Sequence, residues 1–267
     1  MSTATAPAKE RAAIRERTLR KDNWRNYPIV TLVAFTAWLV YGLVRVFMGA
    51  DFFVPQYHYL TPFYSPCLND ACGQAAEFGT FLPKATPFFI PFAAISLPLL
   101  LLFRLTCYYY RKAYYRAYWA APPACAVREP HKSYTGERRF PLIGQNLHRY
   151  FWAAAFLISL INTWDAIRAF HGKDGGFGIG LGTVILVVNV ILLWGYTLSC
   201  HSCRHIVGGR LKNFSKHPIR YWAWMQVSKI NERHGQFALI TLGSLVVADL
   251  YVALVAHGTF SDVRIFN

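Results

Sequence analysis

The chain has 267 residues, of which 54% are apolar and 16% aromatic, yet it carries a formal net charge of +15 and an isoelectric point near 9.7. Its mean hydropathy is positive (+0.24) in spite of that charge. This combination excludes an ordinary soluble domain and indicates an integral membrane protein with basic flanks, for which no nucleic-acid partner is expected.

Five segments are long and apolar enough to cross a hydrocarbon core, which takes about 20 helical residues. They lie near residues 28–49, 86–107, 150–171, 179–200 and 236–257. The predicted fold class is all-α, an integral membrane bundle of five transmembrane helices within residues 28–257. Residues 1–27 form a basic arm, for which an interfacial helix and a disordered flank are both open, and residues 258–267 form a short outer tail.

Basic residues indicate which loops stay in the cytoplasm. The arm, the loop between the second and third spans, and the segment 201–235 are all rich in Lys and Arg. The loop after the first span is acidic and holds one lysine, Lys84. The N-terminus is therefore predicted to be cytoplasmic and the C-terminus outside, in a multi-pass protein of the plasma membrane.

The loop after the first span also contains two cysteines, Cys67 and Cys72, with four residues between them. Disulfides form in oxidising surroundings such as the outer side of the membrane, so a bridge that closes this small loop is the leading interpretation. A second metal pair is disfavoured, because His58 is the one histidine nearby that would complete it.

Polar residues within the spans are costly in lipid and need partners. In the third span, Asp165 and Arg168 stand three residues apart and are expected to pair with each other. In the fifth span, Asp249 is expected to accept a hydrogen bond from Asn189 or from a Ser or Thr of the bundle.

The fourth span ends in Cys200-His201-Ser202-Cys203, and the third and fifth spans begin near His148 and His234. With the predicted topology these four Cys and His side chains share one membrane face and one depth. Two thiolates and two imidazoles suit either a Cys2His2 zinc site or a Rieske-type [2Fe–2S] centre. Further histidines are fallback ligands: His201 and His205. Cys107 and Cys125 are interpreted as ordinary thiols without assigned chemistry.

Two b-type haems are a further alternative, because His148 and His171 bracket the third span while His234 and His257 bracket the fifth. About 23 residues separate the members of each pair, or about 34 Å along a helix, which puts all four outside the hydrocarbon core. Haem b is therefore disfavoured.

An aromatic cluster follows the fourth span. Its rings are explained first as an interfacial aromatic belt, and second as a pocket for a quinone headgroup. The residues of that candidate quinone site are His217, Arg220, Tyr221, Trp222 and Trp224.

Five spans, a basic cytoplasmic face, and Cys200-His-Ser-Cys203 after Trp194-Gly-Tyr-Thr-Leu-Ser together resemble the single-chain membrane anchor of succinate dehydrogenase. The likeness is greatest to the actinobacterial type, which holds an embedded Rieske-type [2Fe–2S] cluster. It covers residues from Trp24 to about His257, and its most specific portions are 145–150 and 194–236.

The resemblance implies an anchor that holds soluble flavoprotein and iron–sulfur subunits at the cytoplasmic face and passes electrons to a membrane quinone, with menaquinone expected. Cys200 and Cys203 would bind one iron, and His148 and His234 the other. Three other interpretations stay open: a dihaem or cofactor-free anchor of a related quinone oxidoreductase, a zinc-stabilised membrane scaffold, and a thiol or metal transport protein. The chain itself carries no nucleophile constellation, phosphate loop or flavin fingerprint, so the oxidation of substrate is assigned to another subunit of an enzyme complex.

Overall fold

Four helices in the described part of the chain are long and apolar enough to cross a membrane. In this computed structural model the described residues are 23, 26–82, 95–107, 109–110 and 142–267. The four helices are α1 (Asn26–Met48), α4 (His148–Arg168, preceded by the 3-10 turn η5, Leu142–Leu147), α5 (Leu181–Leu198) and α8 (His234–Ala256). They match the first, third, fourth and fifth predicted spans to within a few residues.

The second predicted span, 86–107, is described only over its last part. There α2 (Ser96–Thr106) is an apolar helix of 11 residues. Residues 83–94 lie outside the described residues, as do most of the basic arm and the loop 111–141.

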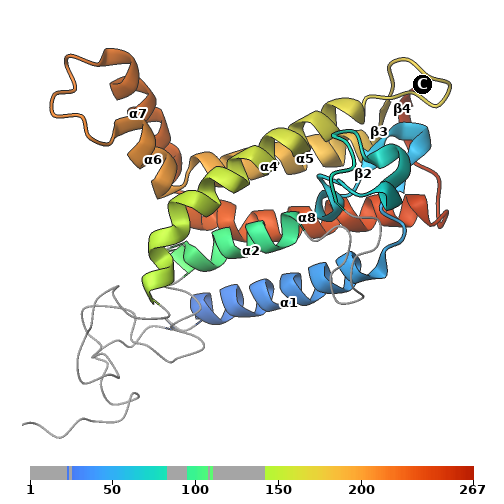
Figure 1. Ribbon diagram of the computed structural model, residues 1–267, viewed down its shortest axis with the longest axis horizontal. Helices are drawn as coiled ribbons and strands as arrows, with labels where there is room; N and C mark the ends of the chain where they lie inside the picture. Colours follow the sequence, from blue (N-terminus) through green and yellow to red (C-terminus); the bar gives the residue numbers. More distant parts are fainter. Residues whose placement is uncertain (1–22, 24–25, 83–94, 108, 111–141) are drawn as a thin grey trace, which may run out of the picture.

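The helices lie side by side along one direction (Figure 1). α8 packs between α5 and α1, while α4 packs against α2 and α5. Many side chains on the outside of the bundle are apolar and largely exposed, as expected where the solvent is lipid rather than water. They include Val33, Val40, Val44, Leu157, Leu160, Val188, Ile191, Val247 and Leu250.

Successive helices run in opposite directions, so the bundle has two distinct ends. At the end we call the thiol end, α2 and α5 finish and α4 and α8 begin. At the other, the loop end, α1, α4 and α8 finish near two short antiparallel ribbons. One ribbon pairs β1 (Phe53–Val54) with β2 (Tyr59–Leu60), and the other pairs β3 (Ile179–Gly180) with β4 (Arg264–Phe266).

The C-terminal tail is fixed to the loop end by Asp262, which is buried. Its carboxylate accepts hydrogen bonds from the Tyr251 hydroxyl (2.7 Å), the Tyr59 hydroxyl (2.9 Å) and the Gly182 backbone N–H (3.0 Å). Arg264 forms an ion pair with the same carboxylate at 3.2 Å. One acidic side chain thus ties together α8, the loop after α1, and the start of α5.

The loop after α1 contains three short 3-10 turns, η1 (Pro55–Tyr57), η2 (Pro62–Tyr64) and η3 (Asp70–Ala75). Cys67 and Cys72 form a disulfide within it, the pairing that the sequence indicated. Both sulfur-bearing side chains are buried in the apolar core.

The predicted pair within α4, Asp165 with Arg168, is wrong. Asp165 accepts a hydrogen bond from the Ser65 hydroxyl, and Arg168 donates to Glu77 at 3.1 Å. Both partners belong to the loop after α1, which folds over the end of α4. A contact made by that loop outcompetes a pairing along one helix, because the loop buries Asp165 whereas Arg168 stays at the surface.

The predicted partner of Asp249 is also wrong. Its carboxylate forms an ion pair with Arg45 of α1 at 2.6 Å and accepts a hydrogen bond from the Tyr41 hydroxyl, also at 2.6 Å. Asn189 instead accepts from Ser244 at 2.8 Å. No local pattern points to Arg45, which is 204 residues from Asp249 and becomes its neighbour only when α1 packs against α8.

Beyond the thiol end, a helical hairpin of α6 (His201–Gly208) and α7 (Pro218–Asn231) projects sideways from the bundle (Figure 1). The two helices pack mainly against each other, and α7 has no fully buried residue.

We expect Asp249→Asn to lower the stability of the protein by about 3–5 kcal/mol, because Arg45 would then be a buried charge without an anion. The double variant Arg45→Met, Asp249→Leu should be markedly more stable than Asp249→Asn, since neither charge remains. Thermal denaturation of the detergent-purified protein measures both. A double variant no more stable than Asp249→Asn would contradict the assignment of the loss to an unpaired charge.

Candidate functional site

Four helix ends meet at the thiol end. α2 ends at Thr106 and is followed by Cys107, and α5 ends at Leu198, two residues before Cys200. His148 and His234 are the first residues of α4 and α8. Because neighbouring helices are antiparallel, these chain positions lie at one depth although they are far apart in sequence.

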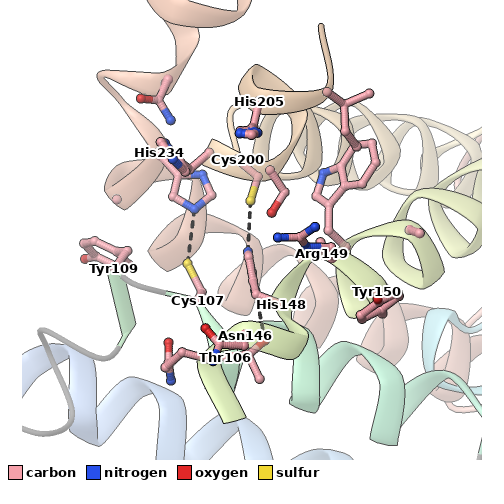
Figure 2. Close-up of a pocket in the computed structure, with 18 of the residues that line it drawn as sticks. Thr106, Cys107, Tyr109, Asn146, His148, Arg149, Tyr150, Cys200, His205 and His234 are labelled. Atoms are coloured by element: carbon pink, nitrogen blue, oxygen red, sulfur yellow. Dashed lines mark hydrogen bonds between the residues drawn. The ribbon is translucent and has the colours of Figure 1, made fainter. Parts of the chain in front are cut away.

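The four side chains form two thiol–imidazole pairs (Figure 2). The Nε2 atom of His148 lies 3.1 Å from the sulfur of Cys200, and the Nε2 atom of His234 lies 3.4 Å from the sulfur of Cys107. Both thiols are buried, as is His234, while His148 is half-buried. Each pair joins two different helices, α4 with α5 and α8 with α2.

The hydrogen bonds behind the rings determine which nitrogen carries the proton. Thr106 donates its hydroxyl proton to the Leu102 carbonyl (2.7 Å), so it accepts from Nδ1 of His148 at 2.9 Å. Ser199 donates to the Tyr196 carbonyl (3.0 Å) and accepts from Nδ1 of His234 at 2.8 Å. Both neutral imidazoles are therefore protonated at Nδ1, and each turns its Nε2 lone pair toward a sulfur. That is the state a metal-binding histidine requires.

The two sulfurs also receive hydrogen-bond donors that would stabilise thiolates. The backbone N–H groups of Tyr109 and Tyr110 donate to Cys107, and the backbone and hydroxyl of Ser202 donate to Cys200. Cys203 differs, because burial alone raises the pKa of its thiol. At Cys107 and Cys200 burial also opposes formation of a thiolate, and the hydrogen-bond donors offset part of that effect.

Aromatic rings fix the two imidazoles in place. Phe103 stacks on His148 with ring centroids 5.1 Å apart and planes within 10°. Tyr196 stacks on His234 at 5.0 Å and 14°. The stacking limits rotation of each imidazole about its side-chain bonds and keeps its Nε2 directed at the thiol.

Both pairs line a cavity of about 1300 Å³ at the thiol end. Its wall also contains aromatic and amide side chains that come from α1, the residues after α2, η5, α4, the end of α7 and the start of α8. Among them are Tyr27, Tyr109, Gln145, Asn146, Tyr150, Trp152, Asn231 and Gln236. The cavity is large enough for an organic ring beside the thiols.

The expectation that Cys200 and Cys203 present their sulfurs to one site fails. It assumed that the two cysteines lie on one helix, but α5 ends at Leu198 and Cys200 is an extended residue that precedes α6. The chain changes direction there, so Cys203 is carried away on α6 and does not line the cavity. Cys107, which was interpreted as an ordinary thiol, takes that place. Its position at the end of the second span, at the same depth as the other three residues, was the signal that could have found it.

The fallback ligands His201 and His205 line the rim of the cavity and are exposed. Across the described residues, no three His, Cys, Asp or Glu side chains gather around one point suitable for a single metal ion. At the loop end, His171 contacts the His58 ring at 4.9 Å and His257 lies 3.3 Å from Asp51.

The five residues of the candidate quinone site do not all come together, although Tyr221 and Trp224 stack with ring centroids 6.2 Å apart. None of them lines the cavity at the thiol end. Arg220 donates to the carbonyls of Val207 (2.9 Å) and Gly209 (3.2 Å) and so caps the end of α6. Trp224 packs under the Arg204 guanidinium at 4.8 Å, whereas His217, Tyr221 and Trp222 are exposed on α7. Arg220 and Trp224 instead stabilise the packing of α7 against α6.

A family model described as actinobacterial succinate dehydrogenase subunit SdhC matches residues 26–258. Among solved structures, the chain is similar to one from the Mycobacterium smegmatis Sdh1 complex in the apo form, with 61% sequence identity and a TM-score of 0.88 over 97% of this chain and 98% of that chain. A comparison with curated proteins finds no match. The chain is thus a multi-pass plasma membrane protein that belongs to the actinobacterial succinate dehydrogenase SdhC family, the membrane anchor that associates with the other subunits of that complex.

Proposed function

We propose that this anchor passes electrons from the iron–sulfur subunit of succinate dehydrogenase to menaquinone through a Rieske-type [2Fe–2S] cluster. The ligands would be Cys107, Cys200, His148 and His234. The observation that carries the proposal is the pair of thiol–imidazole contacts at 3.1 and 3.4 Å beside one cavity. When bound, such a cluster accepts one electron at a higher potential than an all-cysteine cluster does.

The arrangement of the donors favours a two-iron cluster over a single zinc ion. A structural zinc site needs four donors around one point, and the described residues offer no such group. A Rieske-type centre carries two thiolates on one iron and two imidazoles on the other, so in such a centre each Cys–His contact would join a ligand of one iron to a ligand of the other. Because these four donors do not converge on one point, a membrane scaffold stabilised by a single zinc ion is also disfavoured.

The residues around the ligands would hold and tune such a cluster. Thr106 and Ser199 keep the protons of His148 and His234 on Nδ1, and the rings of Phe103 and Tyr196 hold the imidazoles in position. Donors to the sulfurs disperse thiolate charge. The thiols of Cys107 and Cys200 are buried, whereas His148 is half-buried.

The cavity beside the ligands is the site we propose for the quinone headgroup. Tyr109, Tyr150 and Trp152 line it and offer ring faces, while Gln145 and Asn146 offer amides that could bond to a quinone oxygen. This replaces the site on α7, whose arginine is already engaged with α6.

We also propose five spans, with the N-terminus and the thiol end in the cytoplasm. α1 and α4 both begin at the thiol end, so the chain must cross back between them, and α2 lies on that return and ends at the thiol end. Basic residues in the arm and in 201–235 support the orientation. This orientation brings the thiol end to the side on which the soluble subunits would dock.

Electron paramagnetic resonance of the dithionite-reduced complex tests the ligands. Cys107→Ser and Cys200→Ser should each abolish the signal of a cluster with nitrogen hyperfine coupling, because each removes a thiolate ligand. Cys203→Ser is the matched control, the same change at a buried cysteine of the same end, and should keep it. Loss of the signal in Cys203→Ser with retention in Cys107→Ser would contradict the assignment.

Steady-state kinetics test the relay. His148→Ala should lower succinate-dependent reduction of menaquinone at least tenfold, while reduction of a soluble dye that accepts electrons before the anchor stays unchanged. His217→Ala changes an exposed histidine that does not line the cavity and should retain near wild-type quinone reduction. Equal quinone reduction in His148→Ala and wild-type protein would exclude a relay through this site.

Labelling with a membrane-impermeant thiol reagent tests the orientation. Thr259→Cys is expected to react in intact spheroplasts, because the loop end faces outward and Thr259 is exposed. Ser2→Cys should react only after the membrane is opened. The reverse pattern would overturn the proposed orientation.

A further inference from the structure

One buried positive charge at the thiol end has no carboxylate partner. Arg104 of α2 is 2% exposed. Its guanidinium donates to the Tyr110 hydroxyl (2.7 Å), the Ala238 carbonyl (2.8 Å) and the Thr241 hydroxyl (2.8 Å), all of them neutral. Within the described ranges, no Asp or Glu forms an ion pair with it.

Arg45, the other buried arginine among the described residues, does have a carboxylate partner. It is paired with Asp249 at 2.6 Å, so its charge is balanced inside the protein. Moving an unbalanced charge into a bundle surrounded by lipid is costly, and such residues are retained mainly where they serve function. Hydrogen bonds to neutral groups satisfy the N–H donors of Arg104 but leave its net charge uncompensated.

Aromatic rings give Arg104 partial compensation. The guanidinium carbon lies 4.6 Å from the centroid of the Tyr196 ring, 5.4 Å from Trp38 and 5.7 Å from Tyr110. Each ring offers the negative face of its quadrupole. These contacts hold the charge at a defined place without neutralising it.

That place is directly behind the thiol–imidazole pairs. Arg104 lies three residues before Cys107, and Tyr196, over which it stacks, also stacks on His234. The guanidinium is near enough for its charge to act on both Cys107 and His234. The Tyr196 ring thus connects the guanidinium to His234, since it contacts both.

We propose that Arg104 is a built-in countercharge that raises the reduction potential of the centre at the thiol end. This inference rests on the proposed function, in which two thiolates and two neutral imidazoles hold a [2Fe–2S] core. With a 2+ core, such a centre would be neutral when oxidised, and it would carry a charge of −1 after reduction by one electron from the iron–sulfur subunit. No bond forms or breaks in that step. A fixed positive charge in a low-dielectric interior favours the reduced, negative state.

Redox titration of the cluster signal in the purified complex, followed by paramagnetic resonance, tests the role. Arg104→Gln removes the charge, so the reduction equilibrium should shift at least tenfold toward the oxidised state, a midpoint about 59 mV lower for a one-electron couple. Arg104→Lys keeps a charge and should stay within a threefold shift of wild type. An unchanged midpoint in Arg104→Gln would overturn the inference.

A second pair of variants separates charge from structure and serves if Arg104→Gln does not assemble. Thr241→Asp places a carboxylate next to the guanidinium, cancels its field, and should lower the midpoint. Thr241→Asn changes the same contact without charge and should leave the midpoint near the wild-type value. Equal midpoints in Thr241→Asp and Thr241→Asn would count against a countercharge and leave Arg104 as a structural hydrogen-bond donor.

The measurement also distinguishes the inference from the proposed function. If wild-type complex gives no histidine-ligated cluster signal, the proposed function fails and the countercharge with it. If the signal is present and depends on Cys107 and Cys200, but the midpoint potential does not change when the charge at Arg104 is removed, the inference alone fails.

Discussion

Polar groups inside a lipid-surrounded bundle cannot turn to water, so each must find its partner within the protein. This constraint organises the structure from one end to the other. Near the loop end, Arg45 of α1 meets Asp249 of α8 at 2.6 Å, and Asp262 gathers two tyrosine hydroxyls, a backbone N–H and Arg264. Helices and tail that would otherwise meet only through apolar contacts are thereby placed in one register.

The same constraint produces the chemistry at the thiol end. Thr106 and Ser199 are drawn to backbone carbonyls of their own helices, and for that reason they can only accept from the two imidazoles. The tautomers that follow direct both Nε2 atoms at sulfurs. Arg104 is an exception, because its guanidinium donates hydrogen bonds to neutral groups but no Asp or Glu of the described residues balances its charge.

The location of the site on four helices has a consequence for the whole anchor. A centre bound by Cys107, Cys200, His148 and His234 would link α2, α5, α4 and α8, which do not all contact one another along their lengths. Metal binding of this kind contributes to the stability of a fold as well as to its chemistry. In this chain the loop end is held by a disulfide and by Asp262, whereas the thiol end surrounds a large cavity.

By itself the sequence determined the membrane class, the four long spans to within a few residues, the disulfide and the family, because apolar length, charge bias and short spacings are local properties. It also predicted that His148, His234 and Cys200 lie close together, since helix order places span ends at a common depth. Only the tertiary structure shows that Cys107 lies beside them and Cys203 does not, because the chain bends at Cys200 and turns Cys203 away from the cavity. It likewise decided the partners of Asp165, Arg168 and Asp249, which come from segments far away along the chain. Which side chains meet across helices depends on packing and helix direction, and no local pattern in the sequence encodes either.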